Sequence, residues 1–244
     1  MQSSKNIVTL QLITTDNFEY NLEQLCIHIK NTPVGSFIVA PELCLNGYAY
    51  NRLEEASSIS IKAINHLKEL SKNKTITLTL TMMSEQKDKY LNTLYCFNNG
   101  KIVHTQSKYE LFVLNDERKY FTNGSVDDIK IIDIDGLKVG FLICFELRFI
   151  ELWTKLQGAD MIVIPAMWGK LRKENFETLT RGLAVLNQCF VIACNSANDD
   201  MAKSSGIISP FGNEFRDDMS TIISNKINIK EIRKMRRYMQ VGIQ

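Results

Sequence analysis

Hydrophobic and polar residues follow two different periods along the first half of the chain. Apolar side chains recur every three to four residues over 17–31 and 59–72, which predicts two amphipathic helices. Strands are expected over 6–13, over 35–42 up to Pro41, and from Thr75 onward, where apolar positions alternate or run without interruption. This half therefore predicts strands that alternate with helices.

The second half continues the alternation after two predicted hairpins. One hairpin spans 90–106 and turns at Asn99-Gly100, and the other spans 128–144 and turns at Asp135-Gly136. Both dipeptides tolerate the positive φ of a tight turn. Helices are expected over two further segments and strands over two more: 148–158 and 173–188, then 159–166 and 189–196. The pattern predicts an α/β layered fold, and we expect a single domain over 1–244 with a peripheral tail from about residue 230.

Composition narrows the function classes. The chain has 244 residues, of which 45% are hydrophobic and 23% charged, and its net charge of +2 gives no case for nucleic acid or an anionic membrane. The basic segment 230–239 is expected to be a solvated helix face. No stretch is apolar enough to span a bilayer, and the start lacks signal-peptide features, so we expect a cytoplasmic protein. Six cysteines without a CxxC pair are expected to be free thiols.

Three chemically different residues follow predicted strands. Glu42 ends the segment GSFIVAPE, Lys108 follows KIVHTQS, and Cys144 follows GLKVGFLI. Ligands of α/β sheets bind outside strand ends, so these side chains could meet. Cys144 would be a nucleophile, Glu42 the base that takes its proton, and Lys108 the charge that stabilises an oxyanion. The backbone N–H of Phe145 could supply a second donor to the oxyanion.

Each of these residues has a structural reading of its own. A lone cysteine at a strand end is most often a packed core residue. A lysine in a loop is usually solvated, and Pro-Glu after a strand is often only a turn. The catalytic hypothesis therefore depends on the three residues taken together.

Three ordered segments around these residues resemble the motifs of the nitrilase superfamily of carbon–nitrogen hydrolases. They are PELCLNGY at 41–48, KYELF at 108–112 and GFLICFELRFIELW at 140–153. Three segments further along also fit the family: 158–168, 187–195 and 205–213. The resemblance extends from the first strand to about residue 230.

The resemblance implies an α-β-β-α sandwich, usually paired as a homodimer or a higher homo-oligomer. By position, Glu42 would be the general base, Lys108 the oxyanion-stabilising lysine, Cys144 the nucleophile and Glu117 an additional glutamate that orients substrate and base. The implied reaction is attack on a small-molecule amide or nitrile, followed by hydrolysis of a thioester, without a metal or cofactor. Within the family the motifs are most similar to small aliphatic amidases, including ω-amidases of dicarboxylic acid monoamides.

Several residues carry open alternatives. Arg148 could pair a substrate carboxylate or anchor the helix after the nucleophile, and Trp168 could wall the pocket or pack in the core. Ile150 stands where the family usually has proline. Leu183 and Leu186 stand where it often has an arginine and a glutamate, which leaves the helix or dimer geometry there open.

Four other functions remain as alternatives. A nitrilase or N-carbamoyl hydrolase would use the same residues on another substrate. A binding protein could retain the fold without catalysis, and an acyltransferase would pass the acyl group to an amine. A Cys–His hydrolase would need one of the three histidines, His28, His66 or His104.

Overall fold

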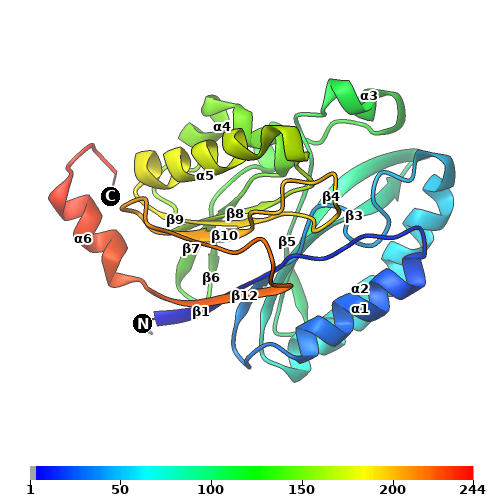
Figure 1. Ribbon diagram of the computed structural model, residues 1–244, viewed down its shortest axis with the longest axis horizontal. Helices are drawn as coiled ribbons and strands as arrows, with labels where there is room; N and C mark the ends of the chain where they lie inside the picture. Colours follow the sequence, from blue (N-terminus) through cyan, green and yellow to red (C-terminus); the bar gives the residue numbers. More distant parts are fainter. Residues whose placement is uncertain (1–3, 244) are drawn as a thin grey trace.

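The computed structural model describes residues 4–243 and contains two six-stranded sheets that pack face to face. Figure 1 shows helices α1 and α2 on the outer side of one sheet and α4 and α5 on the outer side of the other. This arrangement is the predicted α-β-β-α sandwich. The single domain over 1–244 stays a prediction, and residues 1–3 and 244 lie outside the described part of the chain.

The first sheet has the strand order β12-β1-β2-β3-β4-β5. Its strands are β1 (Ser4–Leu10), β2 (Phe37–Val39), β3 (Thr77–Gln86), β4 (Lys89–Asn98), β5 (Lys101–Ser107) and β12 (Ile222–Asn228). Strands β1, β2 and β3 are parallel and are joined by α1 (Phe18–Lys30) and α2 (Leu53–Asn73). The remaining pairs of this sheet are antiparallel, and β4 and β5 are the first predicted hairpin.

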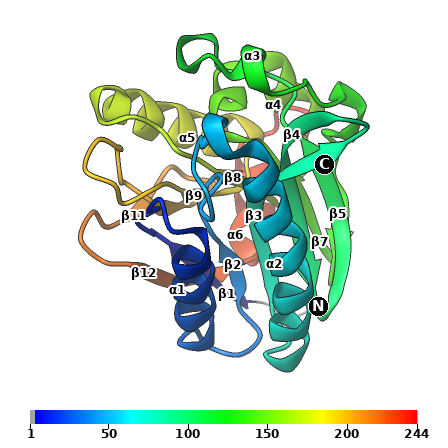
Figure 2. The same ribbon diagram turned by 90° about the vertical axis from the view of Figure 1, so that its right-hand side faces the viewer.

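The second sheet has the strand order β11-β10-β9-β8-β7-β6. Its strands are β6 (Ile132–Ile134), β7 (Leu137–Phe141), β8 (Met161–Pro165), β9 (Phe190–Cys194), β10 (Gly206–Ile208) and β11 (Glu214–Arg216). Strands β7, β8 and β9 are parallel and are joined by α4 (Ile150–Lys155) and α5 (Lys173–Asn187). The short helix α3 (Glu117–Tyr120) and the C-terminal helix α6 (Lys230–Tyr238) lie outside the two helix pairs. Figure 2 gives the view toward α1 and α2.

Alternation along the strands divides the apolar side chains between two cores. On β2, Phe37 and Val39 belong to the core that includes both sheets, whereas Ile38 packs in the core under α1 and α2. Because successive strand residues point to opposite faces, one three-residue strand supplies both layers. All three side chains are at most 1% exposed. A strand buried on both faces is expected to be continuously apolar, as β2 is.

The predicted elements are present with shifted boundaries, and the short helix α3 was not predicted; three further differences are larger. Helix α2 begins at Leu53 rather than at residue 59, and the acidic Glu54 and Glu55 occupy its first turn, where the helix dipole favours them. The short strands β10, β11 and β12 were not predicted, because Gly, Pro, Asn and Asp interrupt their apolar runs. The basic tail forms α6, but Ile232 and Met235 anchor it to the protein.

Two further predictions concern surfaces. No helix within residues 4–243 is long and apolar enough to cross a membrane. On α5, Leu183 is fully buried while Leu186 is 56% exposed. The two leucines that replace the family's polar pair therefore lie in different environments, and only Leu183 is part of the core.

Candidate active site

The predicted catalytic residues come together from both sheets. Glu42 follows β2 and Lys108 follows β5 in the first sheet, whereas Cys144 follows β7 in the second. A backbone bond from Glu42 N to Ala166 O, 3.3 Å long, joins the glutamate loop to the end of β8. Residues that are 36 to 102 positions apart in sequence thus share one end of the sandwich.

Lys108 is at the centre of the cluster and is fully buried. Its Nζ donates to Glu42 Oε1 and to Glu117 Oε1, both at 2.8 Å, and to the Tyr48 hydroxyl at 3.3 Å. Both carboxylates are also fully buried. An ammonium without water needs such partners, because burying an isolated charge is very costly.

Glu42 is held by donors on both carboxylate oxygens. Oε1 accepts from Lys108 and from Asn92 Nδ2, each at 2.8 Å, and Oε2 accepts from the backbone N–H of Met167 at 3.1 Å. These bonds come from β4, from the lysine loop and from the loop after β8. Together these hydrogen bonds hold the Glu42 carboxylate in contact with the Cys144 thiol.

Cys144 begins a short 3₁₀ helix, Cys144–Arg148, and has a φ of 48°. A left-handed backbone is strained for a residue with a Cβ, by about 1–3 kcal/mol, and such strain is typical of active sites. Burial raises the pKa of the Cys144 thiol well above its usual value. The charge of Glu42 raises the pKa further, while Lys108 lowers it. The raised pKa leaves the thiol protonated at neutral pH, so Cys144 could act as a nucleophile only with a base in contact.

The lysine and the second glutamate shift each other's protonation. Burial lowers the pKa of Lys108, but the charges of Glu42, Cys144 and Glu117 outweigh it and leave the pKa above its ordinary value. Burial raises the pKa of Glu117, and the charge of Lys108 opposes this. Lys108 is therefore a permanent cation over the physiological pH range.

A cavity of about 750 Å³ opens beside this cluster. It is lined by Cys144 and Glu117, and by all three residues expected around the substrate: Phe145, Arg148 and Trp168. The guanidinium of Arg148 lies 5.1 Å from the centre of the Trp168 ring and also donates to Asn175 Oδ1 at 3.1 Å. Arg148 is exposed, whereas Trp168 is only 4% exposed. The role of the Phe145 N–H toward an oxyanion stays a prediction.

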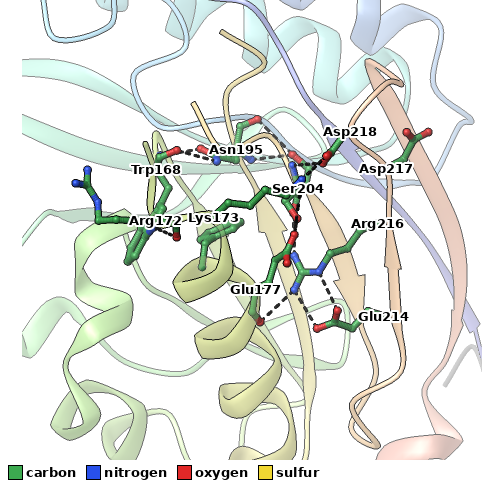
Figure 3. Close-up of polar contacts among 12 residues, drawn as sticks. Trp168, Arg172, Lys173, Glu177, Asn195, Ser204, Glu214, Arg216, Asp217 and Asp218 are labelled. Carbon is green, nitrogen blue, oxygen red and sulfur yellow. Dashed lines mark hydrogen bonds and ion pairs between the residues drawn. The ribbon is translucent and has the colours of Figure 1, made fainter. Parts of the chain in front are cut away.

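A network of hydrogen bonds holds the backbone and the indole ring of Trp168 in place (Figure 3). Trp168 N donates to Asn195 Oδ1 at 2.8 Å, and Asn195 Nδ2 returns a bond to Trp168 O at 3.2 Å. The indole N–H donates to Arg172 O at 2.8 Å. Wall packing and core packing were alternatives for Trp168, and the structure combines them, because the ring lines the cavity and also contacts Phe176.

Four residues of the cluster were given no role from the sequence. Asn92 holds Glu42, Tyr48 contacts Lys108, and Glu146 accepts backbone N–H groups on two loops. Tyr48 and Glu146 lie inside the quoted motifs, which was the available signal. Gly124 donates to Lys108 O at 2.8 Å, and a Cβ there would meet Ser107 O at 2.0 Å, so this position requires glycine.

The histidines do not form a catalytic pair with the cysteine. His28 and His66 lie in α1 and α2, and His104 is buried on β5, where it stacks on Phe141. None of the three lines the cavity that the described residues form. Within residues 4–243, no group of three His, Cys, Asp or Glu side chains is arranged to hold a metal ion.

Comparison with known proteins identifies the family. The model of the carbon–nitrogen hydrolase family matches residues 8–237, nearly the whole chain. The chain belongs to the carbon–nitrogen hydrolases. The predicted resemblance to this family is therefore confirmed.

Individual relatives agree with this assignment. A 2-oxoglutaramate amidase of Bacillus subtilis is 32% identical over 192 residues, which cover 75% of this chain and 73% of the relative. A deaminated glutathione amidase of Escherichia coli is 26% identical over 224 residues, 84% of this chain and 83% of the relative. The crystal structure of Saccharomyces cerevisiae Nit3, a member of the nitrilase superfamily, superposes with a TM-score of 0.86 at 22% identity, covering 99% and 96% of the two chains. This carbon–nitrogen hydrolase thus has the nitrilase-superfamily fold.

The buried charges make a direct prediction about stability. Replacing Lys108 with the similarly sized methionine should destabilise the protein by about 3–5 kcal/mol, because two buried carboxylates lose their cation. The pKa of Glu117 is already raised by burial and should rise further. The folded state then holds a proton that the unfolded state has released, so the destabilisation should be larger near pH 8 than near pH 5.5. Urea unfolding at both pH values measures this.

The matched control is Lys173→Met, which removes an ion pair of Lys173 with Asp218 whose side chains are 35% and 42% exposed. Its cost should stay within about 1 kcal/mol. Equal losses for the two variants at both pH values would contradict the account of Lys108.

Proposed function

We propose that this carbon–nitrogen hydrolase is an amidase that releases ammonia from a small aliphatic amide through a thioester on Cys144. The contact of Lys108 with both Glu42 and Glu117, beside Cys144 at the cavity, carries the proposal. A base, a fixed cation and a thiol within one buried cluster are what acyl transfer to sulfur requires.

In the first half-reaction Cys144 Sγ attacks the amide carbon while Glu42 takes the thiol proton. The carbonyl oxygen becomes an oxyanion, which the Lys108 ammonium and the Phe145 N–H stabilise. The C–N bond then breaks, Glu42 passes the proton to the leaving nitrogen, and ammonia departs. Glu117 holds Lys108 in place throughout, since its Oε1 lies 2.8 Å from Nζ and its Oε2 accepts the Phe112 N–H at 3.0 Å.

In the second half-reaction water attacks the thioester carbon. Glu42 takes a proton from the water, the C–S bond breaks, and the thiol regains its proton as the carboxylic acid leaves. The cluster returns to its starting protonation. The permanent charge of Lys108 suits both oxyanions, because it needs no proton transfer of its own.

The cavity chemistry supports an acyl chain that ends in a carboxylate. Arg148 and Arg172 both line the cavity, and among residues 4–243 neither guanidinium has a carboxylate within ion-pair distance. Each instead lies near an aromatic ring, Arg148 by Trp168 and Arg172 by Phe112, the latter at 5.2 Å. The relatives named 2-oxoglutaramate amidase and deaminated glutathione amidase support the same substrate class. We therefore place monoamides of dicarboxylic acids first.

We further propose that the protein is cytoplasmic and works as a homodimer through the outer face of α5. Val185 and Leu186 are 40% and 56% exposed on this helix, and the 37% exposed Phe211 precedes Gly212, which lies against Val185. Apolar side chains grouped on a helix face favour association. Sedimentation velocity should show a dimer that Leu186→Glu weakens, and an unchanged monomer for both proteins would contradict this proposal.

Replacing the nucleophile tests the chemistry. Cys144→Ala should release no ammonia from succinamate, 2-oxoglutaramate or glutamine, because no thioester can form. Mass spectrometry of the wild-type protein with a slow amide should show one labile acyl adduct, on Cys144. Cys189→Ala, a buried cysteine away from the cavity, is the control and should remain active. Activity of Cys144→Ala near that of the wild type would contradict the proposal.

Replacing the two arginines tests the substrate class. Arg148→Leu and Arg172→Leu should each lower kcat/KM for succinamate by about 10- to 100-fold, the scale of a hydrogen bond to a charged group. Butyramide has the same chain length without the carboxylate, and its kcat/KM should stay unchanged. Arg118→Leu, which removes an exposed arginine outside the cavity lining, is the control. Equal losses on both amides would contradict carboxylate recognition.

A further inference from the structure

Glu146 is a fully buried carboxyl group that the proposed reaction does not use. It lies two residues after Cys144, in the 3₁₀ helix Cys144–Arg148. Its Oε2 accepts the backbone N–H of Ile143 at 2.6 Å, and its Oε1 accepts the backbone N–H of Tyr109 at 2.7 Å. Both bonds are short, as expected for an ionised acceptor.

The two bonded amides flank the two catalytic residues. Ile143 immediately precedes Cys144, and Tyr109 immediately follows Lys108. The first amide belongs to the loop after β7 of the second sheet, and the other to the loop after β5 of the first. One carboxylate therefore joins the nucleophile loop and the lysine loop across the sandwich.

Helix capping explains only one of the two hydrogen bonds that Glu146 accepts. A glutamate at the third position of a helix commonly accepts the N–H of the capping residue, here Ile143. The bond to Tyr109 connects a different loop, 37 residues away, and contributes nothing to the cap. Burial raises the pKa of Glu146 to about 7, so keeping a carboxyl group here has a cost that a capping residue on the surface would avoid.

We propose that Glu146 is a positioning residue that sets the spacing between Cys144 and Lys108. The inference rests on the proposed function, because it concerns the spacing of the nucleophile and the oxyanion cation. Lys108 is held at its backbone by Asn92 O and Gly124 N, each at 2.8 Å, but both partners belong to its own side of the site. Glu146 supplies the connection to the nucleophile's side, and a displacement of about 1 Å there can lower the rate by about 100-fold.

Two substitutions of Glu146 distinguish an effect on the position of the catalytic residues from an effect on the stability of the fold. Glu146→Gln keeps the length of the side chain but replaces one carboxylate oxygen with an NH₂ group. That group cannot accept a hydrogen bond, so one of the two backbone N–H groups loses its acceptor. Glu146→Asp keeps the charge and both acceptors, with a shorter reach. We expect Glu146→Gln to lower kcat for succinamate by about 100-fold with KM within about threefold. We expect Glu146→Asp to keep kcat below that of the wild type but within about tenfold of it.

Alkylation of Cys144 by iodoacetamide gives a second measurement that does not depend on the amide chosen. Peptide mass spectrometry should show that Glu146→Gln slows modification of Cys144 by about tenfold or more, while the half-buried Cys26 reacts at its wild-type rate. Asn187→Ala is the stability control, because it removes a buried side-chain bond to Trp153 O outside the cavity lining. It should leave both kcat and the alkylation rate unchanged.

The outcomes distinguish the two proposals. If wild-type Cys144 reacts no faster than Cys26 and no amide is hydrolysed, the proposed function fails and the inference fails with it. If the wild type is active but Glu146→Gln and Glu146→Asp lower kcat equally, in proportion to their loss of thermal stability, only the positioning role is overturned. If Glu146→Gln does not fold, Glu146→Asp decides: a kcat lowered by up to about tenfold with KM unchanged and slower alkylation of Cys144 is expected, and a wild-type kcat together with a wild-type alkylation rate of Cys144 would overturn the inference.

Discussion

A lysine ammonium held between two carboxylates without access to water is the constraint on which this site depends. Lys108, Glu42 and Glu117 are all fully buried, and the two N–O distances are 2.8 Å. None of the three charges can be buried alone at acceptable cost, so each requires the other two. The cluster is favourable only when the strands that carry it are assembled, and this links the geometry of the site to the completed fold.

The same constraint also accounts for the proposed chemistry. A cation that cannot lose its proton over the physiological range is a fixed electrostatic partner for an oxyanion, while the raised pKa of the Cys144 thiol makes a contacting base necessary. In the proposed reaction Glu42 is that base, and Asn92 and Met167 hold its carboxylate from two further directions. Donors from strand β4 and from the loops directly after β5 and β8 provide the preorganisation. The strained backbone of Cys144 is consistent with this, since the surrounding contacts outweigh its cost.

Much of this could be predicted from the sequence, because periodicity and motifs are local. The alternation of strands and helices, both hairpin turns, and the residues Glu42, Lys108 and Cys144 were all accessible in that way. Asn92 could not be predicted from the sequence. It is one polar residue in a strand whose two faces are both covered, and no local pattern tells which of these faces contacts a glutamate 50 residues earlier. Glu146 was visible within a motif, but its bond to Tyr109 was not, since Tyr109 becomes a neighbour only when the two sheets pack.

The most direct test of the central claim is the titration of the Lys108 ammonium. In protein labelled at lysine Nζ and Cε, the Lys108 resonance can be assigned by its loss in Lys108→Met and followed by NMR as pH rises. We expect it to remain that of a charged amine beyond pH 10.4, the ordinary lysine value, because Glu42 and Glu117 stabilise the cation. Deprotonation at about pH 9 or below would contradict a lysine fixed as a cation between two carboxylates.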